Sequence, residues 1–187
     1  MRNRSPNTAL THISTGHFRG RKVLLPVGDD AMRPTKNQVL LAGLNMLGSR
    51  VNWPDIRLLD ACCGSGQWGL EALSRGAAHV TFADTDTDLL HTNLTTLNAD
   101  KSTCSIHATD ARKLNVTLPF SVIVLDPPYA DKNLYTALFN RQNWGTVGTL
   151  WLVETARDFT PEFPAFLSLL KNNQYGNTQL FLLEQVA

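Results

Sequence analysis

Strand-like and helix-like segments alternate through most of this chain, beginning near Arg57. The strand-like segments are short apolar runs, whereas the helix-like segments repeat apolar residues at helical spacing. Alternating segments of this kind form a mostly parallel sheet that helices cover, so the sequence predicts an α/β fold. In an open α/β sheet, ligands bind at the carboxyl ends of the strands. We expect strands at 58–62, 79–83, 102–106, 120–125, 150–153 and 179–183, and helices at 39–48, 67–74, 88–97 and 132–139.

The length of 187 residues limits the chain to one main domain, which we place at 35–187, with a short arm at 1–34. Hydrophobic residues make up 43% and charged residues 18%, which suits a globular protein with a core and excludes a disordered chain. No apolar run approaches the ~20 residues that span a bilayer, and no apolar stretch follows the N-terminus. We therefore expect a cytoplasmic protein without a membrane segment, with its three cysteines reduced.

The net charge of +1 conceals a basic N-terminal segment. Residues 1–36 hold seven basic and two acidic side chains, while residues 37–187 hold ten basic and fourteen acidic ones. Short β-like stretches at 11–14 and 23–25 enclose a glycine-containing turn, which predicts a small ordered ribbon. A basic ribbon on a mildly acidic body suits a polyanion such as RNA, although the charge alone would equally suit a solvated terminus.

The first expected strand runs into a glycine-rich turn, Asp60-Ala-Cys-Cys-Gly64-Ser-Gly66, that leads into a helix. Glycines let the backbone approach a ligand closely, and the helix start offers free N–H groups. With Gly69 the spacing also matches the dinucleotide fingerprint, a weak signal by itself. Asp60 is more informative, because a carboxylate before the glycines suits a ligand with a positively charged amino group, such as S-adenosylmethionine. The alternative is a turn that uses glycine for packing only.

Two further strand ends carry acids that suit a nucleoside. Asp84 lies 18 residues after Gly66, where an acid can accept hydrogen bonds from the ribose hydroxyls of either NAD or S-adenosylmethionine. Asp110 follows the third expected strand and is placed to meet an adenine amino group. Thr85 or Asp86 is expected to cap the helix that follows.

The most specific pattern is Asp126-Pro127-Pro128-Tyr129, at the end of a clear buried strand. The two prolines fix the backbone and remove two N–H donors, so their carbonyls can only accept hydrogen bonds. Asp126 adds a second acceptor, and Tyr129 adds an aromatic face on which a flat base can stack. Such a site accepts hydrogen bonds from the exocyclic amino group of a base. A rigid turn would account for the prolines but not for the acid and the aromatic ring beside them.

Together these patterns resemble the class I S-adenosylmethionine-dependent amino-methyltransferases, and within them the RsmD family of bacterial 16S ribosomal RNA guanine-N2 methyltransferases. The chain departs from the usual pattern of that family at Gln38, where Arg is usual, and at Leu44, where Phe is common. The resemblance implies a Rossmann-like fold with a mostly parallel seven-stranded sheet, helices on both faces and a small N-terminal β-ribbon. The segments that carry the resemblance are 14–22, 33–35, 59–66, 69–77 and 125–130.

The resemblance also implies an activity: methyl transfer from S-adenosylmethionine to guanine N2 of 16S ribosomal RNA, of the position-966 class, on the assembled or assembling small subunit. The implied catalytic residues are Asp126, Pro127, Pro128 and Tyr129. The implied cofactor-binding residues are Asp60, Ala61, Cys62, Gly64, Ser65, Gly66, Asp84, Thr85, Asp110 and Ala111. The implied RNA-binding residues are Arg19, Arg21, Lys22, Arg33 and Thr35.

Other functions remain open at this point. A DNA adenine-N6 methyltransferase uses the same four-residue site, although 187 residues leave little room for a domain that reads a DNA sequence. A non-catalytic nucleic-acid binder, or a nicotinamide oxidoreductase that uses the glycine pattern, belongs to a different class. The five histidines lack metal-ligand spacing with the cysteines, so we predict no metal, and our default is a monomer. We expect Trp68 to pack close to the cofactor pocket, and Trp144 and Trp151 to lie in the core.

Overall fold

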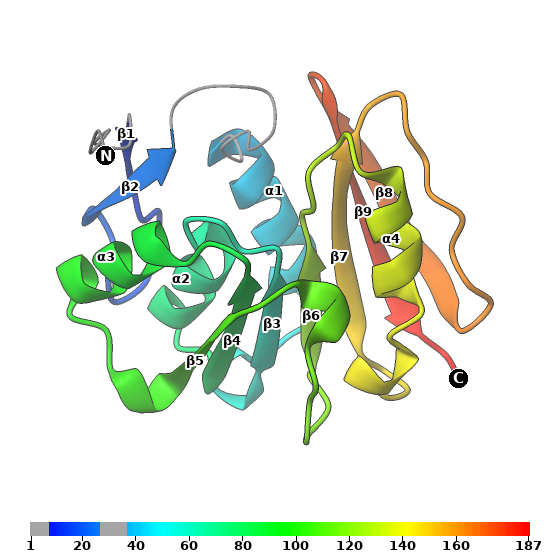
Figure 1. Ribbon diagram of the computed structural model, residues 1–187, viewed down its shortest axis with the longest axis horizontal. Helices are drawn as coiled ribbons and strands as arrows, with labels where there is room; N and C mark the ends of the chain where they lie inside the picture. The colour runs from blue at the N-terminus through cyan, green and yellow to red at the C-terminus, as the bar shows by residue number, and fades with distance from the viewer. Residues whose placement is uncertain (1–7, 27–36) are drawn as a thin grey trace, which may run out of the picture.

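The computed structural model describes residues 8–26 and 37–187, which form a two-stranded ribbon and a seven-stranded sheet with its helices (Figure 1). The strands are β1 (Thr8–His12), β2 (Lys22–Pro26), β3 (Arg57–Ala61), β4 (His79–Asp84), β5 (Cys104–Ala108), β6 (Val122–Leu125), β7 (Leu150–Ala156), β8 (Leu167–Tyr175) and β9 (Thr178–Gln185). The α-helices are α1 (Asn37–Gly48), α2 (Gln67–Ser74), α3 (Asp88–Leu97) and α4 (Lys132–Phe139). Short 3₁₀ turns are η1 (Trp53–Asp55), η2 (Lys101–Thr103), η3 (Ala111–Lys113) and η4 (Gln142–Trp144).

The main sheet has the order β5-β4-β3-β6-β7-β9-β8. β3 pairs in parallel with β4 and with β6, and the parallel pairing continues to β5 on one side and β7 on the other. β9 is antiparallel to both β7 and β8. The strand order reverses between β3 and β6, and the carboxyl ends at such a reversal border the crevice in which open α/β sheets bind ligands. The expected fold class is confirmed.

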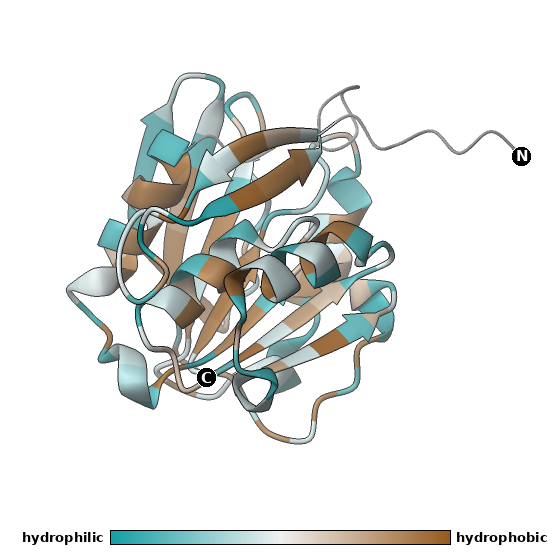
Figure 2. Ribbon diagram, turned by 90° about the vertical axis from the view of Figure 1, so that its left-hand side faces the viewer, coloured by the Kyte–Doolittle hydropathy of each residue, from teal (hydrophilic) through white to brown (hydrophobic). Residues whose placement is uncertain are grey.

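Helices lie on both faces of the sheet and divide the core into two apolar clusters (Figures 1 and 2). One cluster joins the sheet to α1, α2 and α3, and the other joins it to α4 and the η3 turn. Trp144 and Trp151 are fully buried in the second cluster, so both are core residues as expected. α2 is covered so completely that all eight of its residues are buried, which makes it the structural centre of the first cluster.

The three helices α2, α3 and α4 begin and end at the residues that their apolar spacing predicts. The third strand begins two residues later than predicted: the sequence predicts 102–106, and β5 runs from Cys104 to Ala108. The carboxylate of Asp100 accepts the N–H of Ser102 at 2.8 Å and winds Lys101–Thr103 into a 3₁₀ turn. This capping contact delays the start of the strand.

The structure also contains a strand that the segment analysis did not place, β8. Most of its side chains are exposed or half-buried, because β8 forms the edge of the sheet and pairs only with β9. Its register shifts between Leu169 and Lys171, which interrupts any regular alternation of apolar and polar residues. With β8 the sheet reaches the seven strands that the family resemblance implies.

The N-terminal ribbon is ordered and lies against the helices (Figure 2). β1 and β2 pair antiparallel, with Leu10 opposite Leu24. Ile13, Phe18 and Val23 are buried in the same apolar cluster as α1, α2 and α3. The ribbon is therefore a docked element and not a free tail.

Candidate active site

Three carboxylates mark the crevice at the order reversal. Asp60 lies in β3, Asp84 ends β4, and Asp126 directly follows β6. They are close enough that Asp126 and Asp84 both act electrostatically on Asp60. The strand ends therefore bring together three acids that are far apart in the sequence. Three acids in one crevice create a field that favours a cationic ligand.

Asp60 is the most deeply buried of the three, with no exposed surface. Its Oδ2 accepts the N–H of Gly69 at 2.9 Å, whereas its buried Oδ1 has no hydrogen-bond partner among the described residues. Burial raises the pKa of this carboxyl to about 8; the Gly69 N–H opposes the shift, and Asp126 and Asp84 add to it. A buried acceptor without a donor, in an acidic neighbourhood, matches the ammonium group expected at this position.

The glycine loop between β3 and α2 adopts left-handed backbone conformations. Gly64 has φ of +51° and Gly66 has φ of +85°, and Cys62 shares this region with φ of +62°. A Cβ on Gly66 would lie 2.5 Å from a side-chain carbon of Leu90, whereas a Cβ on Gly64 would meet nothing. Gly66 thus serves the packing of the loop on α3, while Gly64 leaves its surroundings open for a ligand. Burial raises the pKa of the Cys62 thiol, which keeps it protonated and poorly nucleophilic.

Gly69 has a different role from the two loop glycines. A Cβ at Gly69 would lie 2.2 Å from the ring of Phe82 on β4. The third glycine of the fingerprint therefore permits close contact between helix and sheet, so the packing alternative holds for this position.

Asp84 closes the loop onto the neighbouring strand. Its Oδ2 accepts the N–H of Gly64 at 2.8 Å, and its Oδ1 accepts the N–H of Asp86 at 3.2 Å and the hydroxyl of Thr85 at 3.4 Å. Asp84 is half-buried and Thr85 is exposed, so both border the crevice. The N-cap of α3 is Thr87, which makes no side-chain capping hydrogen bond, so neither expected residue is the N-cap. Asp86, one residue earlier, accepts the N–H of Asp88 at 3.1 Å through its Oδ1. Thr85 does not reach the helix.

Asp110 and Ala111 lie beyond β5. Asp110 accepts the backbone N–H of Arg112 at 2.9 Å and pairs with its guanidinium at 2.5 Å, and the hydrogen bond from Arg112 lowers the pKa of the Asp110 carboxyl. Ala111 is buried in the core cluster on the α4 face. The acid expected to meet an adenine is thus held ionised by its own neighbour, and Arg112 remains half exposed.

The first residue of the Asp-Pro-Pro-Tyr segment, Asp126, is held by a tryptophan of α2. Trp68, in the first turn of α2, donates its indole N–H to Oδ2 of Asp126 at 3.3 Å. Trp68 is 3% exposed, and a Cβ on Gly43 of α1 would lie 2.5 Å from its ring, so the indole has little freedom to move. Trp68 was expected only to pack near the pocket; the structure adds a polar contact to the central carboxylate.

Tyr129 is anchored through its hydroxyl. The O–H donates to Oε1 of Glu154 at 2.6 Å and lies 3.0 Å from Oγ1 of Thr178. Burial and the Glu154 carboxylate raise the pKa of the Tyr129 phenol, so it stays neutral. The nearby Tyr135 hydroxyl donates to the carbonyl of Glu154 at 2.9 Å and approaches the carbonyl of Pro127 at 3.4 Å. Pro127 is buried, whereas Pro128 is exposed.

Sequence analysis did not identify Glu154 and Thr178 as site residues. Glu154 is an acid within the apolar run of β7 and is 3% exposed. A buried acid is rare unless it has a partner, and this rarity is the one signal that could have drawn attention to it. Thr178 has no such signal, because its role arises from the pairing of β9 with β7.

The basic residues expected to bind RNA differ in their surroundings. Arg19 and Lys22 are exposed on the ribbon. Arg21 is also exposed, but its Nη1 and Nη2 donate to the carbonyls of Leu97 at 2.5 Å and Thr96 at 2.8 Å, at the end of α3. Two of the expected residues, Arg33 and Thr35, lie outside the described residues.

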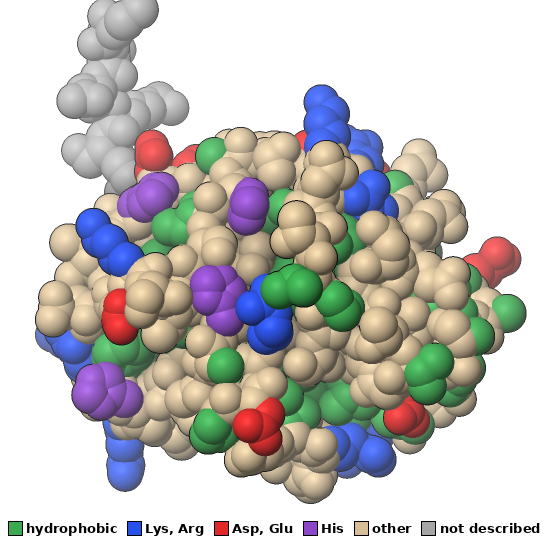
Figure 3. All heavy atoms as spheres, turned by 90° about the horizontal axis from the view of Figure 1, so that it is seen from below, with side chains coloured by type: hydrophobic (Ala, Val, Ile, Leu, Met, Phe, Trp, Pro, Cys, Tyr) green, Lys and Arg blue, Asp and Glu red, His purple; other side chains and the backbone are tan. Residues whose placement is uncertain are grey.

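The face in Figure 3 intersperses basic, acidic and histidine side chains and forms no patch of one charge sign. Within residues 8–26 and 37–187, no group of three His, Cys, Asp or Glu residues is placed to hold a metal ion. In the same ranges, no helix is long and apolar enough to cross a membrane.

Comparisons with known proteins show which family this chain belongs to. A family described as "Conserved hypothetical protein 95" matches residues 11–184. The chain is 34% identical to ribosomal RNA small subunit methyltransferase D of Haemophilus influenzae, over 88% of each chain. It is 31% identical to the protein of that name from Escherichia coli, over 94% of this chain and 90% of the relative. A solved Escherichia coli structure, described as a candidate methyltransferase, superposes with a TM-score of 0.81 at 29% identity and covers 95% of this chain and 99% of its own.

Proposed function

This chain belongs to the family that includes the ribosomal RNA small subunit methyltransferases D, and from that premise we propose that it transfers a methyl group to the exocyclic N2 of a guanine in 16S ribosomal RNA. The methyl donor in this proposal is S-adenosylmethionine, and the target is the position-966 class of guanine. The observation that carries the proposal is the Asp-Pro-Pro-Tyr segment, whose Asp126 lies beside the two carboxylates Asp60 and Asp84 at the order reversal of the sheet. It combines acceptors for an amino group with a group of acids that suits a cation.

The described residues suit the proposed cofactor. The buried Oδ1 of Asp60 has no hydrogen-bond partner among the described residues, and we assign it to accept a hydrogen bond from the amino group of the amino-acid moiety. Gly64 leaves open space beside the loop, and Asp84 lies where ribose hydroxyls would arrive. Ala61, Cys62, Ser65, Gly66, Thr85, Asp110 and Ala111 complete the set we assign to the cofactor. When bound, S-adenosylmethionine supplies a methyl on a sulfonium centre that is already electrophilic.

The remaining task of the protein is to align the guanine amino group, because an electrophilic methyl needs no strong base to be attacked. In this proposal Asp126 accepts a hydrogen bond from that amino group. The Pro127 carbonyl, which the Tyr135 hydroxyl approaches at 3.4 Å, is the second acceptor that we assign. These acceptors favour a more pyramidal nitrogen and stabilise the positive charge that develops on it. Trp68 holds the Asp126 carboxylate in place, because its indole N–H donates to Oδ2 of Asp126 at 3.3 Å.

Tyr129 supplies the surface on which the base stacks. Its hydroxyl is fixed by Glu154 and Thr178, so the ring has one orientation before the substrate arrives. A ring held in this way avoids the entropy cost of ordering it on binding. The two anchors thereby set the plane in which the guanine presents its amino group.

The RNA contacts in this proposal come from the N-terminal ribbon. Arg19 and Lys22 are exposed there, with Arg21, Arg33 and Thr35 completing the set. Shape and phosphate contacts of this kind suit structured RNA in a small subunit. We further propose that the protein acts as a monomer in the cytoplasm, where it would meet small subunits during or after assembly.

The test is transfer of labelled methyl from S-adenosylmethionine to unmethylated small ribosomal subunits, naked 16S RNA and duplex DNA in parallel. We expect label only in RNA, recovered as N2-methylguanosine, and mapping of the modified nucleotide should identify the position-966 class. Label in N6-methyladenine of DNA would replace the proposal with the DNA activity. Bound RNA without any transferred label would indicate a binding protein, and preferential binding of NAD would indicate an oxidoreductase.

A further inference from the structure

Asn93 of α3 is a fully buried amide that lies between two separate parts of the molecule. Its Oδ1 accepts the N–H of Leu24 in β2 at 2.7 Å, and its Nδ2 donates to the Leu24 carbonyl at 2.9 Å. The same Nδ2 donates to the carbonyl of Ser65 in the glycine loop at 3.0 Å. One side chain therefore connects the backbone of the ribbon to the backbone of the loop.

The loop end of this connection lies at the cofactor site. Ser65 stands between Gly64 and Gly66, whose left-handed conformations shape the loop. Gly66 is also the N-cap of α2. Fixing the Ser65 carbonyl therefore fixes the peptide that joins the loop to the helix, within one residue of the N–H that Asp84 holds.

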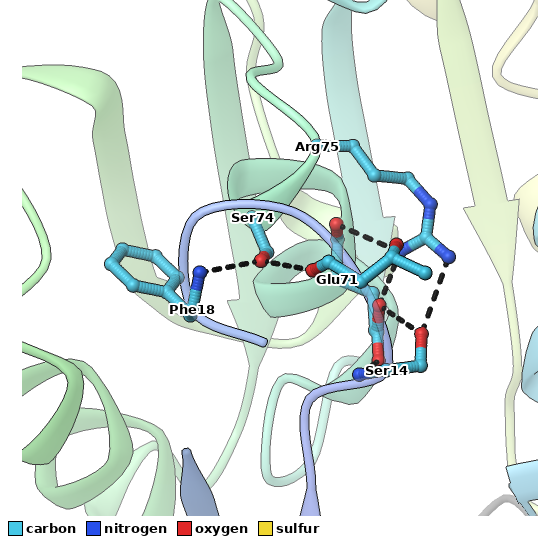
Figure 4. A network of polar contacts seen from close by, with 6 residues as sticks. Ser14, Phe18, Glu71, Ser74 and Arg75 are labelled. Atoms are coloured by element: carbon cyan, nitrogen blue, oxygen red, sulfur yellow. Dashed lines mark hydrogen bonds and ion pairs between the residues drawn. The ribbon is translucent and has the colours of Figure 1, made fainter. Parts of the chain in front are cut away.

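The ribbon end of the connection is rigid because further polar contacts dock the ribbon on α2 (Figure 4). The two carboxylate oxygens of Glu71 accept the N–H of Ser14 at 2.6 Å and its hydroxyl at 2.8 Å. The hydroxyl of Ser74 accepts the N–H of Phe18 at 2.9 Å. Arg75 forms an ion pair with Glu71 and reaches the Ser14 hydroxyl at 3.3 Å.

The turn of the ribbon fits closely against the same helix. The Ser74 carbonyl accepts the N–H of His17 at 2.7 Å, and a Cβ on Gly16 would lie 1.7 Å from that carbonyl oxygen. The ribbon therefore cannot shift on α2 without breaking several buried or part-buried hydrogen bonds. Because leaving such polar groups unpaired is unfavourable, we expect the ribbon, α2 and the loop to move together.

We propose that Asn93 is a positioning residue that couples the RNA-binding ribbon to the cofactor loop. RNA bound on the ribbon holds Leu24 and, through the Asn93 amide, the Ser65 carbonyl in the conformation that binds the cofactor. Because linkage between two ligands is reciprocal, bound cofactor tightens RNA binding by the same factor. This inference rests on the proposed RNA substrate, but it assigns no contact of Asn93 with either ligand.

The experiment is equilibrium dialysis of labelled S-adenosylhomocysteine, which binds but does not react, with and without saturating unmethylated small subunits. In the wild type we expect the subunits to lower the Kd of the ligand about tenfold, within the usual range of coupling between two sites. In N93A and N93D the ratio should fall to about twofold or less. N93D keeps the acceptor for Leu24 and loses both donated bonds, so it tests the link to Ser65 even if N93A folds poorly.

The matched control is N143D, which makes the same chemical change at an exposed residue of η4. It adds the same negative charge as N93D, so it should retain the wild-type ratio of Kd values if coupling and not charge is responsible.

A second measurement uses the wild-type protein alone. Bound subunits should slow hydrogen exchange at the Gly64 and Gly66 amides.

An unchanged Kd ratio in both Asn93 variants would overturn the inference, and so would a wild type without coupling or without slowed exchange. These results differ from a failure of the proposed function. If wild-type protein makes N2-methylguanosine but shows no coupling, the function stands and the role of Asn93 is wrong. If it makes none and does not bind the subunits, the proposed function itself fails.

Discussion

The two sides of the crevice between β3 and β6 are built from different kinds of contact. On the β3 side, Asp60 accepts the N–H of Gly69, nine residues further along the chain. On the β6 side, the Tyr129 hydroxyl contacts Glu154 and Thr178, which are 25 and 49 residues away. Contacts within one strand, loop and helix, together with Asp84 from the next strand, thus organise the cofactor side, whereas contacts between segments further apart in the chain organise the base side.

Because the two sides are built differently, we expect substitutions on them to have different effects on methyl transfer and on cofactor binding. Substitutions on the base side should slow methyl transfer with little effect on cofactor binding. Substitutions on the cofactor side should weaken cofactor binding first.

The largest effect is expected for D126A. Removing the acceptor of the reacting amino group should lower kcat about 10²–10³-fold, the usual loss for one group that stabilises developing charge. The Kd of S-adenosylhomocysteine, measured by calorimetry, should stay within about threefold of wild type, because the cofactor contacts lie on the β3 side. An equal loss of cofactor binding would show that Asp126 belongs to the cofactor side and not to the base side.

The next effect is expected for D60N on the other side of the crevice. The amide oxygen can still accept the Gly69 N–H, but the buried charge that would pair with the ligand's ammonium group is gone. We expect the Kd of S-adenosylhomocysteine to rise about 10–100-fold, the value of a hydrogen bond to a charged group. A Kd within twofold of wild type would remove Asp60 from the cofactor site.

The raised pKa of Asp60 adds a pH dependence to the same comparison. Because this pKa is about 8 in the free protein, the carboxyl is mostly protonated at pH 6, and binding an ammonium group must first ionise it. The Kd of wild type should therefore fall as pH rises from 6 to 8 and then level off, while that of D60N stays flat.

The same pKa shift predicts the stability of the free protein. The folded pKa lies above the ordinary value of 3.8, so the contribution of Asp60 to stability is fully present below about pH 4 and is lost progressively up to about pH 8. Denaturant unfolding across this range should show a smaller decline for D60N than for wild type.

A smaller effect is expected for W68F, which removes the indole N–H that holds Asp126. Losing one such hydrogen bond should lower kcat about three- to tenfold and leave the KM for S-adenosylmethionine unchanged. W144F is the matched control, since Trp144 is equally buried but its indole N–H contacts no acceptor among the described residues. If W144F lowers kcat as much as W68F, the effect is general core loosening.

The smallest effects are expected for two arginines of the ribbon, Arg19 and Arg21, whose substitutions should change different properties. Arg19 is exposed, so R19A should reduce the salt dependence of RNA binding by the slope of about one phosphate contact. Arg21 donates to the carbonyls that end α3, so R21A should lower the melting temperature more than R19A does. Adding R33A to both should flatten the salt slope further, and an unchanged slope in the triple variant would exclude the ribbon as the RNA contact.

Features that depend on residues close together in the sequence were predicted well, whereas features that depend on residues far apart were not. The helices α2, α3 and α4 were predicted to the residue, because their apolar spacing and end signals are local. The edge strand β8 was not, because its polar residues form a strand only where β9 offers backbone partners. Nor did the sequence indicate that Arg21 donates to a carbonyl in the last turn of α3, 75 residues away.

The sequence alone was enough to predict the order of the strands and helices apart from β8, together with the glycine loop and the Asp-Pro-Pro-Tyr segment, since each of these depends on residues that are close along the chain. Only the tertiary structure decided that Trp68 holds Asp126, that Glu154 and Thr178 anchor Tyr129, and that Asn93 joins the ribbon to the loop. These contacts connect segments whose neighbours are chosen by sheet order and core packing. A hydrogen bond between such segments leaves no spacing in the sequence, because its geometry exists only after the sheet has formed.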